Sequence, residues 1–317
     1  MIPNSTSSLK YREVIHQEEF VSAQSSAKIS QITIEVRRKQ FEIDLLVNVG
    51  ENLAFYGYEK NLIWALSDVF LSHFEKDDPS RPGRQNVINS GLFRKCVDNS
   101  DLVAVVRHEG QIVSFSTFDF LFDDALTMLT KGTFTRRGYD RRFGLGNMLN
   151  VTFGMVAAEH CWILNSQAEF RVLGRTQHPL QVVSTNRHTD YCLCSTSPNL
   201  TIRERQLFTN LAAYFYPESL YNKQTGIAED VYLGSGAPPL VPEIKTELEE
   251  EFSAIGAADA LYFLGFLHSH QSKIYRKLRK FAEKIFDPNL DKIAAVIAMS
   301  VDDAAKTSSM KQLKIAV

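Results

Sequence analysis

A short glycine-rich segment with arginines around it is the part of this sequence best suited to binding a phosphate. Residues 136–146 read RRGYDRRFGLG and precede an apolar stretch with helical spacing. Glycines allow a backbone to approach a phosphate closely, and the N–H groups at the start of a helix point toward such an anion. We therefore predict a pyrophosphate site here. The alternative is that the segment has only a structural role. In that case its glycines form a left-handed turn ahead of a helix, and its arginines are solvated.

Two common phosphate-binding motifs do not fit this segment. A dinucleotide-binding GxGxxG would need glycine at position 149, where the chain has Leu149, and no GxxxxGK[ST] P-loop occurs in the sequence. The residues alone therefore indicate a phosphate-bearing ligand without naming it.

Several carboxylates that can act as a general base stand on or next to predicted strands. Asp119 alternates with phenylalanines within one strand, Asp123 and Asp124 follow that strand, and Glu169 opens the next one. A carboxylate can take the proton of an attacking amine, directly or through water. The structural alternative is that these are ordinary polar residues at strand ends, because catalytic carboxylates are a minority even in clefts.

Hydrophobic periodicity predicts the elements that must hold these residues in place. The predicted strands cover 32–36, 41–49, 101–108, 111–122, 125–135, 169–173 and 191–195, and the predicted helices cover 59–74, 147–160, 181–186 and 201–216. The three strands between 101 and 135 form a meander. The glycine-rich segment therefore connects the last strand of a meander to an apolar helix.

The motif and this element order together resemble the GNAT superfamily of N-acyltransferases. Arg141-x-x-Gly144-x-Gly146, at the start of a helix that follows a meander, is similar to the family's [QR]-x-x-G-x-[GA] motif, and the resemblance covers residues 32–216. It implies an α/β (α+β) fold with a mixed, mostly antiparallel sheet flanked by helices. In that family the loop amides bind the pyrophosphate of coenzyme A, and two neighbouring strands splay to admit its pantetheine arm.

The resemblance also implies roles for individual residues. Asp119 or Glu169 would be the base, and Tyr191, a loose counterpart of the family's tyrosine, would protonate the leaving thiolate. Acetyl-CoA or another acyl-CoA would be the substrate, and no metal is expected. The residues expected to bind coenzyme A are Thr135, Arg136, Arg137, Arg141, Arg142, Phe143, Gly144, Leu145, Gly146, Asn147, Thr176 and Gln177.

Two departures from the family pattern leave other functions open. Gly138-Tyr139-Asp140 stands where the family usually has a proline, and no Y-x-x-x-G-F signature follows the last helix. One hypothesis is an enzyme that transfers an acyl group from coenzyme A, or from an acyl carrier protein, to a small amine or an amino acid. A second is a regulatory module that binds an acyl thioester without turnover, and a third is a plain interaction protein.

We predict four parts along the chain: a polar leader over 1–30, an acyltransferase-like domain over 31–216, a linker over 217–242 and a C-terminal helical region over 243–317. Within the last part, residues 257–271 are predicted to form a helix.

A second helix in the C-terminal part combines an apolar face with many cations. Residues 272–286 read SKIYRKLRKFAEKIF, with six basic side chains: Lys273, Arg276, Lys277, Arg279, Lys280 and Lys284. A core-packed helix with a solvated basic face is one interpretation. A docking surface for something acidic, such as a membrane surface or an acyl carrier protein, is the other.

The composition limits the partners and the compartment. The 35 basic and 37 acidic residues give a net charge of -2, which excludes a strongly basic nucleic-acid-binding protein. Four cysteines are too few for a disulfide scaffold, and they lack the paired C-x-x-C spacing of a zinc site. The first residues lack a secretory pattern, and the longest apolar stretch is shorter than the roughly 20 residues that span a bilayer. We expect a cytoplasmic protein with no transmembrane segment and no nucleic-acid partner.

Overall fold

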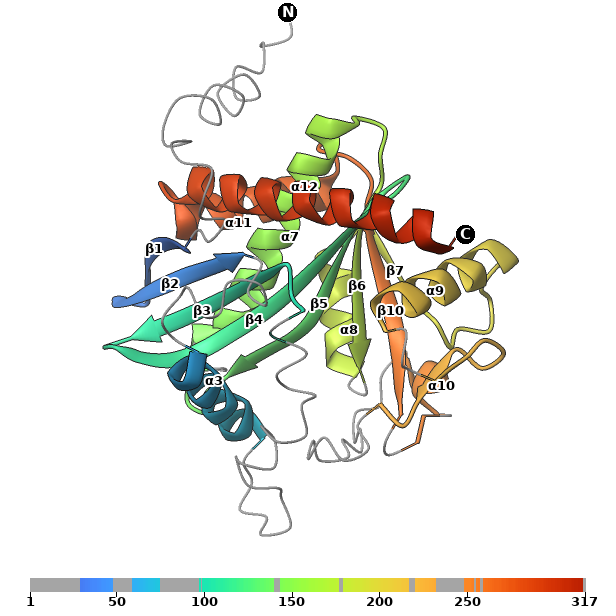
Figure 1. Ribbon diagram of the computed structural model, residues 1–317, viewed down its shortest axis with the longest axis horizontal. Helices are drawn as coiled ribbons and strands as arrows, with labels where there is room; N and C mark the ends of the chain where they lie inside the picture. The colour runs from blue at the N-terminus through green and yellow to red at the C-terminus, as the bar shows by residue number, and fades with distance from the viewer. Residues whose placement is uncertain are drawn as a thin grey trace, which may run out of the picture.

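The meander predicted over residues 101–135 lies in the middle of one large sheet (Figure 1). The structure, a computed structural model, describes residues 29–47, 59–74, 97, 99–139, 143–176, 179–216, 220–231, 248–253, 255–256 and 259–315. The strands within these residues are β1 (Ile29–Val36), β2 (Lys39–Val47), β3 (Leu102–His108), β4 (Gln111–Phe122), β5 (Leu126–Thr135), β6 (Phe170–Thr176), β7 (Tyr191–Cys194), β8 (Leu220–Asn222), β9 (Ile227–Glu229) and β10 (Ala260–Leu267). They are ordered β1-β2-β3-β4-β5-β6-β10-β9-β8, and β7 also pairs with β10.

Helices cover both faces of this sheet. They are α3 (Glu59–Phe74), α7 (Leu145–Leu164), α8 (Pro179–Arg187), α9 (Ile202–Phe215), α10 (Glu249–Phe252), α11 (Lys273–Phe286) and α12 (Leu290–Ile315). The helices α7, α11 and α12 share the largest apolar core with one face of the sheet, whereas α3 and α9 cover separate clusters on the other face. This mixed α/β architecture, with a mostly antiparallel sheet, confirms the predicted fold class.

The composition of α7 explains its central place. Apolar residues surround this helix, and 14 of its residues are buried. A helix that is apolar all round must be covered on all sides. It accordingly lies between the sheet on one side and α11 and α12 on the other. Among the described residues, no helix contains an apolar stretch long enough to cross a membrane.

The predicted helix over 257–271 is wrong, and so is the prediction that the C-terminal region is wholly helical. Residues Ala260–Leu267 form β10, which pairs antiparallel with β6 from Leu261–Thr176 to Leu267–Phe170. All eight residues of β10 are buried, so the sequence lacks the alternation that marks a strand. Because β10 stands between β6 and β9, the C-terminal region shares a sheet with the preceding domain.

The predicted leader and linker lie partly outside the described residues, which leave out 1–28, 217–219 and 232–247. Within the part of the linker that is described, β8 and β9 form a hairpin, and β9 pairs with β10. This portion of the predicted linker is therefore part of the sheet.

Candidate functional site

The strands β5 and β6 are parallel, and they pair over only part of their length. Residues 126–129 pair with residues 170–173, although β5 continues to Thr135 and β6 to Thr176. Figure 1 shows the two strands starting side by side and ending well apart. The backbone groups of β5 just past Leu129 are therefore not paired with β6, and the sheet opens there. We call this the open end, and the stretch where the strands pair is the paired end.

A bulge in β5 coincides with the open end. In the ladder between β4 and β5, Phe118 is opposite Thr130 and Thr117 is opposite Gly132, so Lys131 is the extra residue. A bulge bends and twists the strand that carries it. Because Lys131 comes two residues after the last β5–β6 pair, the bulge accounts for the divergence of the strands.

The glycine-rich segment leads from the open end of β5 into α7. Gly144 is the residue that precedes the helix, with φ of 64°, in the left-handed region that glycine enters without strain. It has no side chain that could cap the first turn. The first N–H groups of an α-helix have no partner within the helix, and they carry the positive end of the helix dipole. The start of α7 therefore offers an anion site beside the opening.

The two glycines of the motif have different structural roles. A Cβ at Gly146 would collide with Cγ2 of Thr133, so this glycine allows α7 to lie directly against β5. A Cβ at Gly144 would meet nothing within 4 Å. Gly144 thus provides the backbone conformation, and Gly146 provides close packing, a role that the sequence prediction did not include.

Aromatic residues anchor the glycine-rich segment to the sheet. The ring centroids of Phe143 and Phe41 are 5.2 Å apart, and those of Tyr139 and His108 are 5.8 Å apart. Phe41 and His108 belong to β2 and β3, and both are buried. Of these four residues only Phe143 was predicted to belong to the site. The i, i+4 spacing of Tyr139 and Phe143 is the signal that sequence reasoning missed.

The predicted arginines differ in where they lie: Arg136 is held by other residues, Arg137 is exposed, and the other two lie outside the described residues. Arg136 donates from Nε to the carbonyl of Ile112 at 2.8 Å, and its Nη2 lies 3.9 Å from Oδ2 of Asp68 on α3. Its guanidinium is therefore held by the sheet and by α3. Arg137 is exposed. The other predicted coenzyme A contacts Arg141, Arg142 and Gln177 lie outside the described residues.

The remaining predicted cofactor residues lie at the end of β5, in the first turn of α7 and at the end of β6. Thr135 is buried, and its hydroxyl lies 2.8 Å from that of Ser114. Leu145 is buried as well, and Thr176 is buried at the end of β6. Asn147 is exposed and accepts a hydrogen bond of 3.4 Å from Ser184 on α8, so α7 and α8 meet beside the opening.

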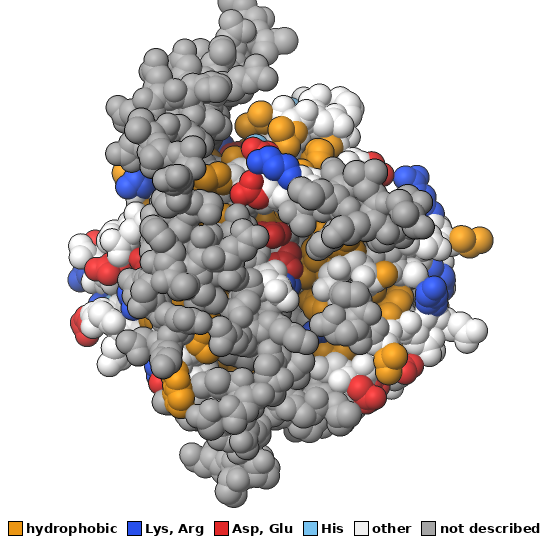
Figure 2. All heavy atoms as spheres, viewed as in Figure 1, with side chains coloured by type: hydrophobic (Ala, Val, Ile, Leu, Met, Phe, Trp, Pro, Cys, Tyr) orange, Lys and Arg blue, Asp and Glu red, His pale blue; other side chains and the backbone are white. Residues whose placement is uncertain are grey.

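Asp119 lies next to the point where β5 and β6 separate. It stands opposite Leu129, the last residue of β5 that pairs with β6. Its Oδ2 is 2.5 Å from Nζ of the bulge residue Lys131, and its Oδ1 accepts from the backbone N–H of Asp101 at 3.3 Å. The side chains of Lys131 and Asp119 are only 11% and 12% exposed. Figure 2 shows acidic side chains reaching the surface at the centre of this face, over β4 and β5.

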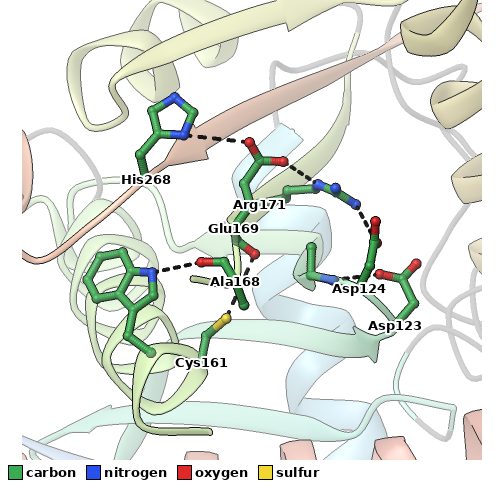
Figure 3. Close-up of polar contacts among 9 residues, drawn as sticks. Asp123, Asp124, Cys161, Ala168, Glu169, Arg171 and His268 are labelled. Atoms are coloured by element: carbon green, nitrogen blue, oxygen red, sulfur yellow. Dashed lines mark hydrogen bonds and ion pairs between the residues drawn. The ribbon is translucent and has the colours of Figure 1, made fainter. Parts of the chain in front are cut away.

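Glu169 lies at the paired end, far from the start of α7. Eight residues of β5 separate its level from that of Thr133, which is roughly 25 Å along a strand. Figure 3 shows its carboxylate between Arg171 and His268: Oε2 accepts from Nε of Arg171 at 2.9 Å, and Oε1 is 3.6 Å from Nδ1 of His268. Asp119 stands opposite Leu129, four residues along the chain from the level of Glu169, or roughly 13 Å, so the structure does not bring Glu169 together with Asp119.

Tyr191 is also at the paired end. Its ring stacks on Phe266 and on His268, with centroid distances of 4.3 and 5.2 Å. Burial raises the pKa of its hydroxyl, and the nearby carboxylates of Glu169 and Glu204 raise it further. A tyrosine in this environment holds its proton firmly, and it stands away from the opening.

Asp123 and Asp124 complete a charged network at the paired end, which we call the paired-end cluster: Asp123, Asp124, Glu169, Arg171 and His268. Nη1 of Arg171 lies 3.8 Å from Oδ1 of Asp124. Burial raises the pKa of Asp123, and the hydrogen bond between the two aspartates lowers the pKa of Asp124. The charged groups of the cluster stabilise one another (Figure 3). The two aspartates lie in the turn between β4 and β5, where Asp123 accepts from the N–H of Ala125.

The predicted basic helix is α11, and one of its cations is used inside the protein. Arg279 pairs with Glu159 of α7 and donates to Glu283 at 2.8 Å. The same helix packs into the core through Tyr275, Leu278, Ala282 and Phe286, and the Tyr275 hydroxyl also donates to Glu159. The cations that remain exposed on this helix are Lys273, Arg276, Lys277, Lys280 and Lys284.

The described cysteines are unreactive thiols. Burial raises the pKa of Cys161 to about 11 and that of Cys192 to about 12, and it also raises the pKa of Cys194. Since the thiolate is the reactive form, none of these three is suited to act as a nucleophile at neutral pH. Within the described ranges, no group of three or more His, Cys, Asp or Glu side chains is arranged to hold a metal ion.

Comparisons with known proteins do not identify a family for this chain. No protein-family model matches the chain, and no curated protein sequence matches it.

Proposed function

We propose that this protein is an N-acyltransferase that moves an acyl group from an acyl thioester to an amine. The observation that carries the proposal is the opening between β5 and β6 beside the start of α7. Together the two features offer a slot for a thioester arm and a helix end for its phosphates. The motif and the order of strands are similar to those of GNAT enzymes, which use such an opening for pantetheine.

The chemistry requires little from the side chains. A thioester is already activated, so an amine can attack it directly once the two are held together. The N–H groups of β5 just past Leu129 would donate to the thioester carbonyl as it gains negative charge. Asp119 would take the proton of the amine. The C–N bond forms, the C–S bond breaks, and the thiolate leaves and takes up a proton from solvent.

Binding and turnover can be tested separately. Calorimetry with coenzyme A and acetyl-CoA is expected to show binding, which weakens with salt because phosphate charges are involved. A thiol-reactive dye should then report release of free thiol when amines and amino acids are supplied. Failure of any coenzyme A thioester or acyl carrier protein to bind would contradict the proposal.

A second candidate is a module that binds an acyl thioester without turnover. The observation that favours it is the separation of the predicted catalytic residues, because Tyr191 and Glu169 stand at the paired end while Asp119 is paired with Lys131. Tight binding of acetyl, medium-chain and carrier-linked thioesters without thiol release from any of them would support this candidate over the enzyme.

The donor is either coenzyme A or an acyl carrier protein, since both present a phosphopantetheine arm. The exposed cations of α11 would attract an acidic carrier. Reversing Lys277, Lys280 and Lys284 to Glu should slow transfer from the carrier and leave transfer from coenzyme A unchanged. Arg279 is left intact in this variant because it holds α11 to α7. Both donors, and the reduced cysteines, fit a cytoplasmic location.

A further inference from the structure

The ion pair at the open end has unusual surroundings. Asp119 and Lys131 are each about nine-tenths buried, and they share a face of the sheet with two apolar clusters. Leu129 and Leu121 belong to the cluster under α9, and Phe134 belongs to the cluster under α3. A buried ion pair in apolar surroundings contributes little net stability, because removing both charges from water is costly. Its presence beside the opening therefore calls for another explanation.

The charged groups around this pair are held by other contacts. Asp101 donates its N–H to Asp119, and its own Oδ2 accepts from the N–H of Phe120 at 2.7 Å. Lys131 also donates to the carbonyl of Asn99 at 2.9 Å. Across the opening, the guanidinium of Arg175 on β6 lies 3.9 Å from the ring centroid of Tyr216. The site therefore presents one carboxylate and one ammonium directly to each other.

We infer that the acceptor is an amino acid, a zwitterion with an ammonium and a carboxylate, and that Asp119 and Lys131 bind its two charges. The inference depends on the proposed function. The acceptor's ammonium takes the place of Lys131 on Asp119, and its carboxylate pairs with Nζ of Lys131. One ion pair becomes two, and no net charge enters the site. A simple monoamine would bring one positive charge into apolar surroundings without a negative charge of its own.

This arrangement also sets up the reaction. Asp119 takes a proton from the bound ammonium, and the neutral amine attacks the carbonyl carbon of the thioester. The C–N bond forms, the C–S bond breaks with its electrons on sulfur, and the second proton that the nitrogen loses balances the proton that the thiolate takes up. The products are an N-acyl amino acid and a free thiol. Lys131 touches only the carboxylate of the acceptor, so it determines specificity.

The test compares acceptors that differ only in the carboxylate, such as leucine with 3-methylbutylamine and phenylalanine with phenethylamine. Thiol release is measured with acetyl-CoA and with a longer acyl-CoA. The wild-type kcat/KM is expected to favour the amino acid of each pair by about 10- to 100-fold, the effect of one hydrogen bond between charged groups. The Lys131→Met variant should lose this preference through a higher KM, whereas Lys131→Arg should retain it.

A matched control variant shows whether the effect is specific to Lys131, and the wild-type preference itself tests the inference. Lys292→Met removes an exposed cation on α12, outside every proposed binding surface, and should leave the preference unchanged. Equal use of amines and amino acids by the wild type would overturn the inference and leave the proposed function intact. A folded Lys131→Met variant that still prefers amino acids would overturn it as well. If coenzyme A binds and no acceptor releases thiol, the proposed enzyme activity and this inference fail together.

Discussion

The two ends of the β5–β6 pair differ in how their polar groups are satisfied. At the paired end, Glu169, Arg171, His268 and the two aspartates contact one another around strands that are fully hydrogen-bonded. At the open end, the strands separate, and a helix begins at a glycine that has no side chain to cap it. The charged groups of the first arrangement contact one another, whereas in the second the backbone of β5 past Leu129 is not paired with β6.

This difference shows why residue type alone does not identify a site. Asp119 and Glu169 are both carboxylates next to cations, and both were predicted as possible bases. Only Asp119 stands where the sheet opens, and only its ion pair includes a bulge residue. We therefore expect changes at the open end to affect activity and changes at the paired end to affect stability.

The largest expected effect is at Asp119. Asp119→Asn should lower kcat/KM by about 10²- to 10⁴-fold, the usual contribution of a general base. Glu169→Gln and Tyr191→Phe should keep activity close to that of the wild type, because both residues lie at the paired end. Thiol-release kinetics on folded variants, checked by circular dichroism, measure this contrast. A strong loss in Glu169→Gln alone would reverse our assignment of the two ends.

The next largest effect is at Gly146. Gly146→Ala would place a methyl group against Thr133, whose hydroxyl donates to Asn150 at 3.0 Å and so cannot easily move. Overpacking of this kind should lower the free energy of unfolding by about 1–3 kcal/mol and weaken coenzyme A binding.

Gly144→Asn is the matched comparison for this variant. The new side chain enters open space, and asparagine tolerates the left-handed conformation better than most residues. Urea denaturation should therefore show a smaller loss than for Gly146→Ala. An equal loss in both variants would contradict the separate roles of the two glycines.

A smaller effect is expected at Arg171, which holds the paired-end cluster together. Arg171→Met leaves Glu169 and Asp124 without this cation, but both carboxylates are partly exposed and water can solvate them. The free energy of unfolding should fall by about 1–2 kcal/mol, less than for a fully buried pair. Coenzyme A affinity should not change, and calorimetry can verify this.

The smallest effect concerns pH and His160, near the end of α7. Burial lowers the pKa of this imidazole below its ordinary value of 6.5. As the pH falls below 6.5, the unfolded chain takes up a proton that the folded protein resists, so stability present above pH 6.5 is lost on acidification. Between pH 7.5 and 5.5, the free energy of unfolding of His160→Gln should fall by less than that of the wild type, with a difference of about 1 kcal/mol or less. Tm measured at both pH values shows this as a smaller drop in the variant. A steeper drop in the variant would contradict the direction of the shift.

The sequence alone predicted the elements whose hydrophobic residues recur with a clear helix or strand period. The strand over 111–122 and the helix over 59–74 were predicted with the bounds that the structure shows. The apolar pattern of the helix extends over more than three turns, and the pattern of the strand extends over many alternating residues. The strand β10 was predicted as a helix because its residues are apolar on both faces. The strand β4 is buried on both faces as well, but its alternating serines and phenylalanines keep a strand period that β10 lacks.

The site was only partly predictable for a related reason. The glycines at 144 and 146 and the carboxylate at 119 are visible as residue types, and their neighbourhood at the open end follows from the predicted order of elements. The bulge at Lys131 and the end of pairing at Leu129 are properties of two strands together. A single sequence contains no local signal for either of them. The ion pair between Asp119 and Lys131 could therefore not be inferred before the fold.

The position of β10 has a consequence for how the chain is assembled during synthesis. This strand comes after residue 259, yet it fills the place between β6 and β9. Until the ribosome has released it, β6 has one unpaired edge, and exposed strand edges promote aggregation. The strands β7, β8 and β9 therefore join the rest of the sheet only when β10 is in place, and this favours slow folding because the β6–β10 contacts are distant in sequence. Chains truncated before residue 259 should be prone to aggregate even though they contain the whole glycine-rich segment.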